Sequence, residues 1–63
     1  MDTVLIYPHK RGKLAGKWDW KRLDAHNRNI VATSHNQGYE NPGDCEDMAR
    51  KINANAVFTR TDG

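Results

Sequence analysis

The side chains that could hold a metal ion are scattered along this sequence. Histidines stand at positions 9, 26 and 35, the single cysteine is Cys45, and no two of these residues have a spacing typical of zinc ligands. Cys45 also falls in an apolar pattern that predicts a helix, which would place its thiol in a hydrophobic core. We therefore expect no metal site and no cofactor.

Carboxylates for acid–base catalysis could come from Asp44, Glu46 and Asp47, which are close together in the sequence. These positions fall at the expected beginning of a helix, where acids are favoured because they offset the positive end of the helix dipole. No Ser, Cys or Lys stands in a sequence context that indicates an activated nucleophile. The sequence therefore predicts a protein that is not an enzyme.

A phosphate-binding loop is suggested at first sight by Gly12-Lys13-Leu14-Ala15-Gly16-Lys17. The nucleotide-binding pattern has one more residue between its glycines, ends in Ser or Thr, and opens a helix. Here Trp18 follows Lys17, and the segment leads into an expected strand. We reject the motif on these grounds.

Trp18 and Trp20 lie among basic residues, so they could form a platform on which nucleic-acid bases stack. The two rings are also the largest apolar groups available to a chain in which only 37% of the residues are hydrophobic. We therefore favour the interpretation that both rings lie in a core or a dimer interface. The residues that could instead contact a partner are Lys10, Arg11, Lys13, Lys17, Lys21, Arg22 and Tyr39.

Three segments have the residue types and alternation of strands, namely residues 3–7, 18–22 and 30–33. Pro8 ends the first of them or places it at a sheet edge. The second alternates aromatic and charged residues, which puts Trp18 and Trp20 on one face of the sheet. A polar turn over residues 25–29 separates the second from the third.

A helix is predicted to begin at Pro42, with Asn41 as its N-cap. Acids come first along it, and the bases Arg50 and Lys51 come last, which complements the helix dipole at both ends. Asn53 or Asn55 can close it, and residues 56–59 follow as a short fourth strand. One apolar stripe covers the tryptophan face and consists of Cys45, Met48, Ala49 and Ile52.

These elements predict one α+β domain over residues 1–63. Its sheet is expected to be antiparallel, with three or four strands in the chain order β-β-β-α-β and one helix packed on one face. The residues expected in the core or in a dimer interface are Val4, Ile6, Trp18, Trp20, Ile30, Cys45, Met48, Ile52 and Val57.

Taken in order, several short motifs resemble the YegP-like family of small bacterial and archaeal domains of unknown function. The motifs are Val4-Leu5-Ile6-Tyr7, Trp18-x-Trp20, a polar turn, Ile30-Val31-Ala32 leading to a Ser or Thr, and Gly38-Tyr39-x-Asn41 before the acidic-capped helix. The resemblance covers about residues 4–58. Because such domains often dimerise as single repeats or pair as tandem repeats, it implies the same fold and a dimer, and it implies no activity.

The sequence departs from the family pattern at several points. His26-Asn27 stands where Asn-Gly is usual, the first loop is longer, and two extra residues precede Tyr39. Arg22 replaces a residue that is commonly apolar. If the two tryptophans face the core, Arg22 lies on the same side and must reach the rim, pair with an acid or meet a partner.

Size and composition limit how this chain can be stabilised. A chain of 63 residues is near the lower limit for one apolar core, and one cysteine cannot form an intramolecular disulfide, so self-association is the usual remedy. The sequence has neither the apolar run of a signal peptide nor a stretch long enough to span a membrane, so we expect a cytoplasmic protein with no membrane partner.

The basic residues are concentrated in the first half. Residues 1–30 hold seven Lys or Arg against three Asp, and residues 31–63 hold three against five acids. The favoured hypothesis is a non-catalytic protein–protein interaction module, a homodimer that suits a phage or bacterial accessory factor modulating a host protein. The alternative is weak nucleic-acid binding through the basic first loop and second strand. An enzyme is the third hypothesis, for which no catalytic constellation is present.

Overall fold

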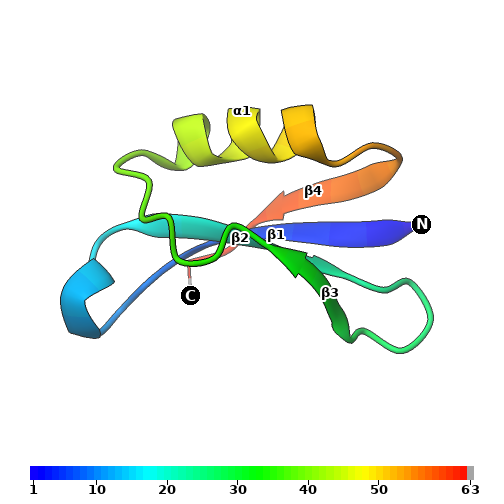
Figure 1. Cartoon of the computed structure of the whole chain (residues 1–63), viewed down its shortest axis with the longest axis horizontal. Coiled ribbons are helices and arrows are strands. Elements are labelled where there is room, and N and C mark those ends of the chain that lie inside the picture. Colours follow the sequence, from blue (N-terminus) through cyan, green and yellow to red (C-terminus); the bar gives the residue numbers. More distant parts are fainter. Residues whose placement is uncertain (63) are drawn as a thin grey trace.

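Four strands form one sheet, and a single helix covers one of its faces (Figure 1). The computed structural model describes residues 1–62. Its elements are β1 (Asp2–Pro8), the 3-10 turn η1 (Gly12–Leu14), β2 (Trp18–Leu23), β3 (Ile30–Thr33), α1 (Pro42–Ile52) and β4 (Ala56–Arg60). The strand order across the sheet is β3-β2-β1-β4. The chain is therefore an α+β fold with the predicted order of elements.

The expected all-antiparallel sheet is wrong at one pair. β1 pairs with β2 and β2 with β3 in antiparallel fashion, but β4 runs parallel to β1. The reason is the connection through α1. The helix carries the chain from the end of β3 back across the sheet, so β4 begins at the same end as β1 and β3 and takes the free edge of β1. The sheet is mixed.

The register places the tryptophans on the helix side. Ile6 is opposite Trp20, and Pro8 is opposite Trp18, so these side chains share a face with Val4. The buried core consists of Val4, Ile6, Trp20, Cys45 and Ala49, with Trp18, Ala32, Tyr39, Ala56 and Phe58 packed around it. The period-two pattern of residues 18–22 thus predicted this face correctly.

The helix has the predicted ends but a narrower buried stripe. Asn41 is the N-cap, Pro42 is the first helical residue, and Asn53 closes the helix. The buried positions are four residues apart, at Cys45, Ala49 and Asn53. Cys45 and Ala49 are small, so they let the helix backbone lie close to the bulky tryptophan face.

Two residues expected in the core or in a dimer interface lie outside the core along this helix. Met48 and Ile52 are 37% and 62% exposed, because the helix turns its i+3 positions toward solvent rather than toward the sheet. Ile30 and Val57 are likewise more than half exposed, since both stand on the face that the helix does not cover. In the single chain these four residues are not core. None of the helices in residues 1–62 is long and apolar enough to cross a membrane.

Candidate functional site

A buried carboxylate lies at the end of the sheet where β1 ends and β2 begins. Asp19 has no exposed surface, although the alternation of β2 turns it away from the helix. It accepts a hydrogen bond from His9 Nε2 at 2.6 Å, one from the Ser34 hydroxyl, and a bifurcated one at 3.3 Å from the Gly38 backbone N–H. We call these four residues, His9, Asp19, Ser34 and Gly38, the Asp19 cluster.

The electrostatics of the Asp19 cluster are those of a structural anion. Burial acts to raise the pKa of Asp19, but the hydrogen bonds from Ser34, His9 and the Gly38 backbone outweigh it, and the pKa lies below its ordinary value. Because an ionised carboxylate only accepts, Nε2 must be the protonated nitrogen of the His9 ring. The carboxylate thereby ties together the end of β1, the start of β2 and the segment after β3.

A serine, a histidine and an aspartate in contact suggest a catalytic triad, but their order is wrong for one. In a triad the serine donates to the histidine, and the aspartate orients the far side of that ring. Here Ser34 and His9 both donate to Asp19, so the serine hydroxyl is held by an acid and is not activated by a base. The hydrogen bonds to Asp19 therefore hold His9 and Ser34 in place.

Gly38 completes the Asp19 cluster with its backbone N–H, and its position requires a glycine. Its φ is +74°, in the left-handed region that residues with a Cβ adopt at a cost. A Cβ built there would stand 2.9 Å from Leu14 Cδ2, so η1 packs directly against this backbone. The next residue, Tyr39, forms an isolated bridge with Trp18 through two backbone hydrogen bonds of 2.7 and 2.8 Å. Burial raises the pKa of the half-buried Tyr39 hydroxyl.

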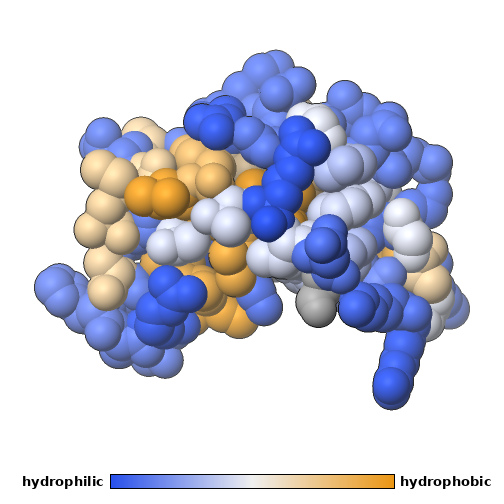
Figure 2. All heavy atoms as spheres, turned by 180° about the vertical axis from the view of Figure 1, so that it is seen from behind, coloured by the Kyte–Doolittle hydropathy of each residue, from blue (hydrophilic) through white to orange (hydrophobic). Residues whose placement is uncertain are grey.

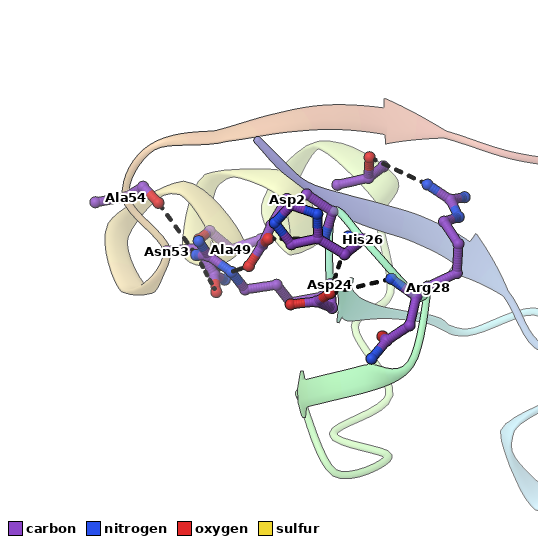
Figure 3. Close-up of polar contacts among 11 residues, drawn as sticks. Asp2, Asp24, His26, Arg28, Ala49, Asn53 and Ala54 are labelled. Atoms are coloured by element: carbon purple, nitrogen blue, oxygen red, sulfur yellow. Dashed lines mark hydrogen bonds and ion pairs between the residues drawn. The ribbon is translucent and has the colours of Figure 1, made fainter.

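Arg22, which was expected to need an acid or a partner on the tryptophan face, makes its contacts within the chain, at the opposite end of the sheet. Its Nε donates to Asp2 at 2.8 Å, and its Nη1 donates to the Ala54 carbonyl at 3.1 Å and to Asn53 Oδ1 at 3.4 Å. The hydrogen bond from Arg22 holds the pKa of Asp2 below its ordinary value. Asn53 in turn donates to the Ala49 carbonyl, as the close-up of this rim shows (Figure 3). Arg22 therefore joins β1 to the end of α1.

The other predicted partner-binding bases do not gather into one surface. Lys17 pairs with Glu40, and Lys21 stands over the Tyr7 ring with its Nζ 4.9 Å from the ring centre, on the open sheet face. The three exposed bases of the first loop are Lys10, Arg11 and Lys13. The tryptophans are turned toward the helix, and Trp20 is only 3% exposed, so they offer no platform beside these bases.

An apolar row crosses the sheet face that the helix leaves open. Val57 on β4 pairs with Thr3 on β1, Thr3 pairs with Leu23 on β2, and Leu23 pairs with Ile30 on β3. An irregularity in the β2–β3 register leaves Val31 beside Ile30, against the same residue. Val57, Ile30 and Val31 are 51%, 57% and 56% exposed, whereas Leu23 is buried.

This row lies at the end of the sheet where β1, β3 and β4 begin and where β2 and α1 end. We call this end of the sheet the apolar end. Its exposed large side chains are Met1, Ile30, Val31, Ile52 and Val57. Figure 2, seen from behind, shows apolar atoms gathered in the half of the molecule that holds the beginning of β1 and of β4. The Asp19 cluster lies at the other end.

The remaining candidate groups are the side chains that could hold a metal ion and the Cys45 thiol. Within residues 1–62 no three His, Cys, Asp or Glu side chains are grouped so that they could hold a metal ion, and no pocket is formed. Burial raises the pKa of the Cys45 thiol to about 11, so this core thiol stays protonated.

Sequence reasoning missed the Asp19 cluster and Val31. The alternation in β2 did place Asp19 opposite the tryptophans, but on a sheet face that the helix does not cover, where an acid is expected to meet water. His9 and Ser34, which cover it, are 10 and 15 residues away. No local pattern signals such a contact.

A scan against protein-family models finds no match, and searches of curated proteins and of solved structures find no chain that is similar.

Proposed function

We propose that this chain is a small, non-catalytic protein–protein interaction module that self-associates and presents its apolar end to another protein chain. The observation that carries the proposal is the apolar row across the open sheet face. Three β-branched residues from two edge strands, Ile30, Val31 and Val57, leave more than half of their surface in water. Exposed apolar residues gathered at one place mark a contact surface more often than residues scattered singly do.

The energetics favour burial of this surface by a partner. Complete burial of one Val or Ile side chain contributes about 1.5–3 kcal/mol, so a row of three half-exposed side chains can contribute several times RT to association. The polar groups of the same region are already engaged within the chain, as Arg22 is with Asp2. A partner that covers the apolar end therefore gains apolar burial without separating these ions.

We further propose that the chain is a single-repeat member of the YegP-like group that acts in the cytoplasm as a phage or bacterial accessory protein on a host protein. The residues that support this are the sequence motifs themselves. Gly38 and Tyr39, for example, stand at a strained backbone position and at a bridge to the Trp18 strand, which are structural reasons for such a motif.

Nucleic-acid binding is the weaker candidate. Lys10, Arg11 and Lys13 are exposed together on one loop, which is the observation in its favour. Against it, Lys17 and Arg22 are engaged with Glu40 and Asp2. Trp20, only 3% exposed, is also unavailable for stacking on a base.

The test is a capture experiment with the full chain immobilised through a C-terminal tag. The double variant Ile30→Asp/Val57→Asp charges the apolar end, and Lys10→Asp/Lys13→Asp is its matched control, with the same two new acids on the basic loop. We expect a protein that the wild type and the control both retain and that the apolar-end variant loses, followed by titration with the purified partner.

Two outcomes contradict the proposal. Binding that the control loses, and that falls steeply between about 50 and 200 mM salt, favours a nucleic acid on the basic loop. Retention of the same proteins by all three forms means that the apolar end is not the contact surface.

A further inference from the structure

The sheet face opposite α1 has an apolar floor that extends beyond the apolar row. The register places Leu5 of β1 between Thr59 of β4 and Lys21 of β2, one step along the strands from that row. Within residues 1–62 no helix or strand lies over this face, whereas α1 covers the other (Figure 1). We call it the open face.

Two cations without an ion-pair partner stand on the open face. Lys21 lies over the Tyr7 ring, and Arg28 reaches from the β2–β3 turn to donate a 3.4 Å hydrogen bond to the Thr3 hydroxyl. Neither forms an ion pair with another of residues 1–62. The contacts that they do make engage a ring and a neutral hydroxyl, so both positive charges remain available to a partner.

The acids of this chain are placed elsewhere. Among the strand residues the only acids are Asp2 and Asp19. Asp2 is paired with Arg22 on the helix side, and the Asp19 carboxylate is buried. The exposed acids Asp44 and Asp47 belong to α1, on the covered side of the sheet. A partner of the open face must therefore bring its own carboxylates together with apolar side chains.

A segment that lies over a sheet face has to satisfy its own backbone, which favours a helix. The backbone groups of a sheet point toward neighbouring strands, so an extended segment can pair with them only at an edge. An α-helix makes its hydrogen bonds internally. The width agrees as well. Val57 and Ile30 stand on the two edge strands, three strand spacings or about 14 Å apart, and a helix with its side chains is about 10–12 Å across.

We infer that the open face binds an acidic amphipathic helix of another protein. The apolar stripe of that helix lies over the aliphatic side chains of the floor, and the acids at its margins pair with Lys21 and Arg28. This inference deepens the proposed function and rests on it, because it names the kind of partner that the apolar end receives.

A membrane surface fits the open face less well. Anionic membranes attract clusters of about four to eight Lys or Arg, whereas this face holds two cations. Tryptophans that would anchor at a membrane interface are on the other side of the sheet, where Trp18 and Trp20 pack with the helix.

The experiment selects helical peptides with the full chain. The probe is a phage-displayed library of peptides of about 18 residues, or five helical turns, with leucines fixed at i, i+3, i+4 and i+7 spacing and the flanking positions randomised among Glu, Lys, Gln and Ser. A second library has the same composition with leucines at every other position. We expect the wild type to enrich Glu at the flanks of the helical library and to enrich nothing from the alternating one.

Reversing the two charges should reverse the selection. Lys21→Glu/Arg28→Glu should enrich Lys at the flanks and bind the wild type's best peptide at least about tenfold more weakly in fluorescence anisotropy, which corresponds to about 1.4 kcal/mol. Lys10→Glu/Lys13→Glu makes the same change of charge on the basic loop and should select as the wild type does. Lys21→Gln/Arg28→Gln brings no new acid near Asp19 and serves if the first variant does not fold.

A second measurement needs no variant. In methyl NMR spectra of the wild type, the selected peptide should shift Leu5, Ile30 and Val57 and leave Ala49 unchanged. The inference is overturned if no peptide is enriched, if the flanks show no preference for Glu, if the loop variant alone changes the preference, or if the shifts lie on the helix side. Binding to phosphatidylserine vesicles without peptide selection also overturns it, in favour of a membrane.

The outcomes separate this inference from the proposed function. If charging the apolar end abolishes the capture of a protein while no acidic peptide is selected, the proposed function stands and this inference falls. If neither a protein is captured nor a peptide selected, both fall.

Discussion

The two ends of the sheet differ in their unusual side chains: one end buries a carboxylate, and the other leaves apolar side chains exposed. At one end the chain folds His9, Ser34 and Gly38 over Asp19, so that a fully buried carboxylate has its hydrogen bonds satisfied within the chain. At the other end Ile30, Val31, Ile52 and Val57 stay more than half exposed. The first end has its buried carboxylate hydrogen-bonded within the chain, and the second leaves large apolar side chains in water.

The difference teaches where this small domain obtains its stability and where it can interact. A buried carboxylate needs its hydrogen-bond donors held in fixed positions, so we expect the Asp19 end to tolerate few substitutions. Exposed aliphatic side chains contribute little to the stability of the single chain, so substitutions at the apolar end should change folding little. Under the proposed function the same substitutions should weaken association. Variants at the two ends should therefore separate folding from binding.

Among the polar contacts, the largest expected effect is at the Asp19 cluster. Asp19→Ala leaves the His9 and Ser34 donors without their acceptor, and breaking such a buried pair costs about 3–5 kcal/mol, a large part of the stability of a chain this size. Urea unfolding of Glu40→Ala, which removes an exposed acid paired with Lys17, is the control and should change little.

Ser34→Ala keeps this test informative if Asp19→Ala does not fold. It removes one donor to the carboxylate, and we expect a loss of about 1.5–3 kcal/mol in the free energy of unfolding. A wild-type urea midpoint in both variants would mean that the cluster does not anchor this end.

Two residues one turn apart on the helix show the same difference between a buried and an exposed position. Ala49 is fully buried against the sheet, whereas Ile52 belongs to the apolar end. Ala49→Asp should abolish the cooperative thermal transition because it buries an unpaired charge, and Ile52→Asp should shift the midpoint by only a few degrees. Equal loss in both variants would show that Ile52 is packed in solution, as it would be within an oligomer.

Acid should weaken the Asp19 end in a defined direction. The pKa of Asp19 lies below its ordinary value of 3.8, so its contribution to stability is complete above that pH and is lost as the pH falls through the lower, folded-state value. Asp2 and Glu46, whose pKa values Arg22 and Arg60 lower, act in the same sense. A carboxyl ¹³C titration of the folded protein should show Asp19 still ionised at pH 3.8. Protonation of Asp19 above that pH would contradict the anionic cluster.

A smaller effect is expected where the backbone closes the cluster. Gly38→Ala introduces a Cβ at a φ of +74° and 2.9 Å from Leu14 Cδ2, which should cost about 1–2 kcal/mol. In the double variant Leu14→Ala/Gly38→Ala the steric contact is relieved and only the backbone cost remains. If thermal melts show no loss in the single variant, the turn adopts another conformation.

The smallest predicted change is a gain, at the apolar end. Arg28 has a φ of +63° in the β2–β3 turn, where a glycine is favoured, and its side chain donates a 3.4 Å hydrogen bond to the Thr3 hydroxyl. Arg28→Gly should raise the free energy of unfolding by about 0.4–1 kcal/mol, measured by urea. A loss of stability would show that the Thr3 contact outweighs the backbone strain.

Much of the fold could be predicted because its signals are local. The Trp18-x-Trp20 alternation determined which face of β2 meets the helix, and Asn41-Pro42 determined where the helix begins. Its end was predicted at one of two residues, and Asn53 is the one that closes it. The stripe on that helix was only half right. Spacings of three and four residues are equally compatible with a helical face, and the choice between them depends on how closely the helix approaches the sheet.

What the sequence by itself determined is therefore the identity of the elements and the face that each strand turns toward the helix, because backbone periodicity and capping chemistry act over a few neighbouring residues. Only the tertiary structure decided that β4 runs parallel to β1, that Asp19 is buried and that one face of the sheet stays open. These features depend on which distant segments meet, and local periodicity says which side chains share a face without saying what covers that face.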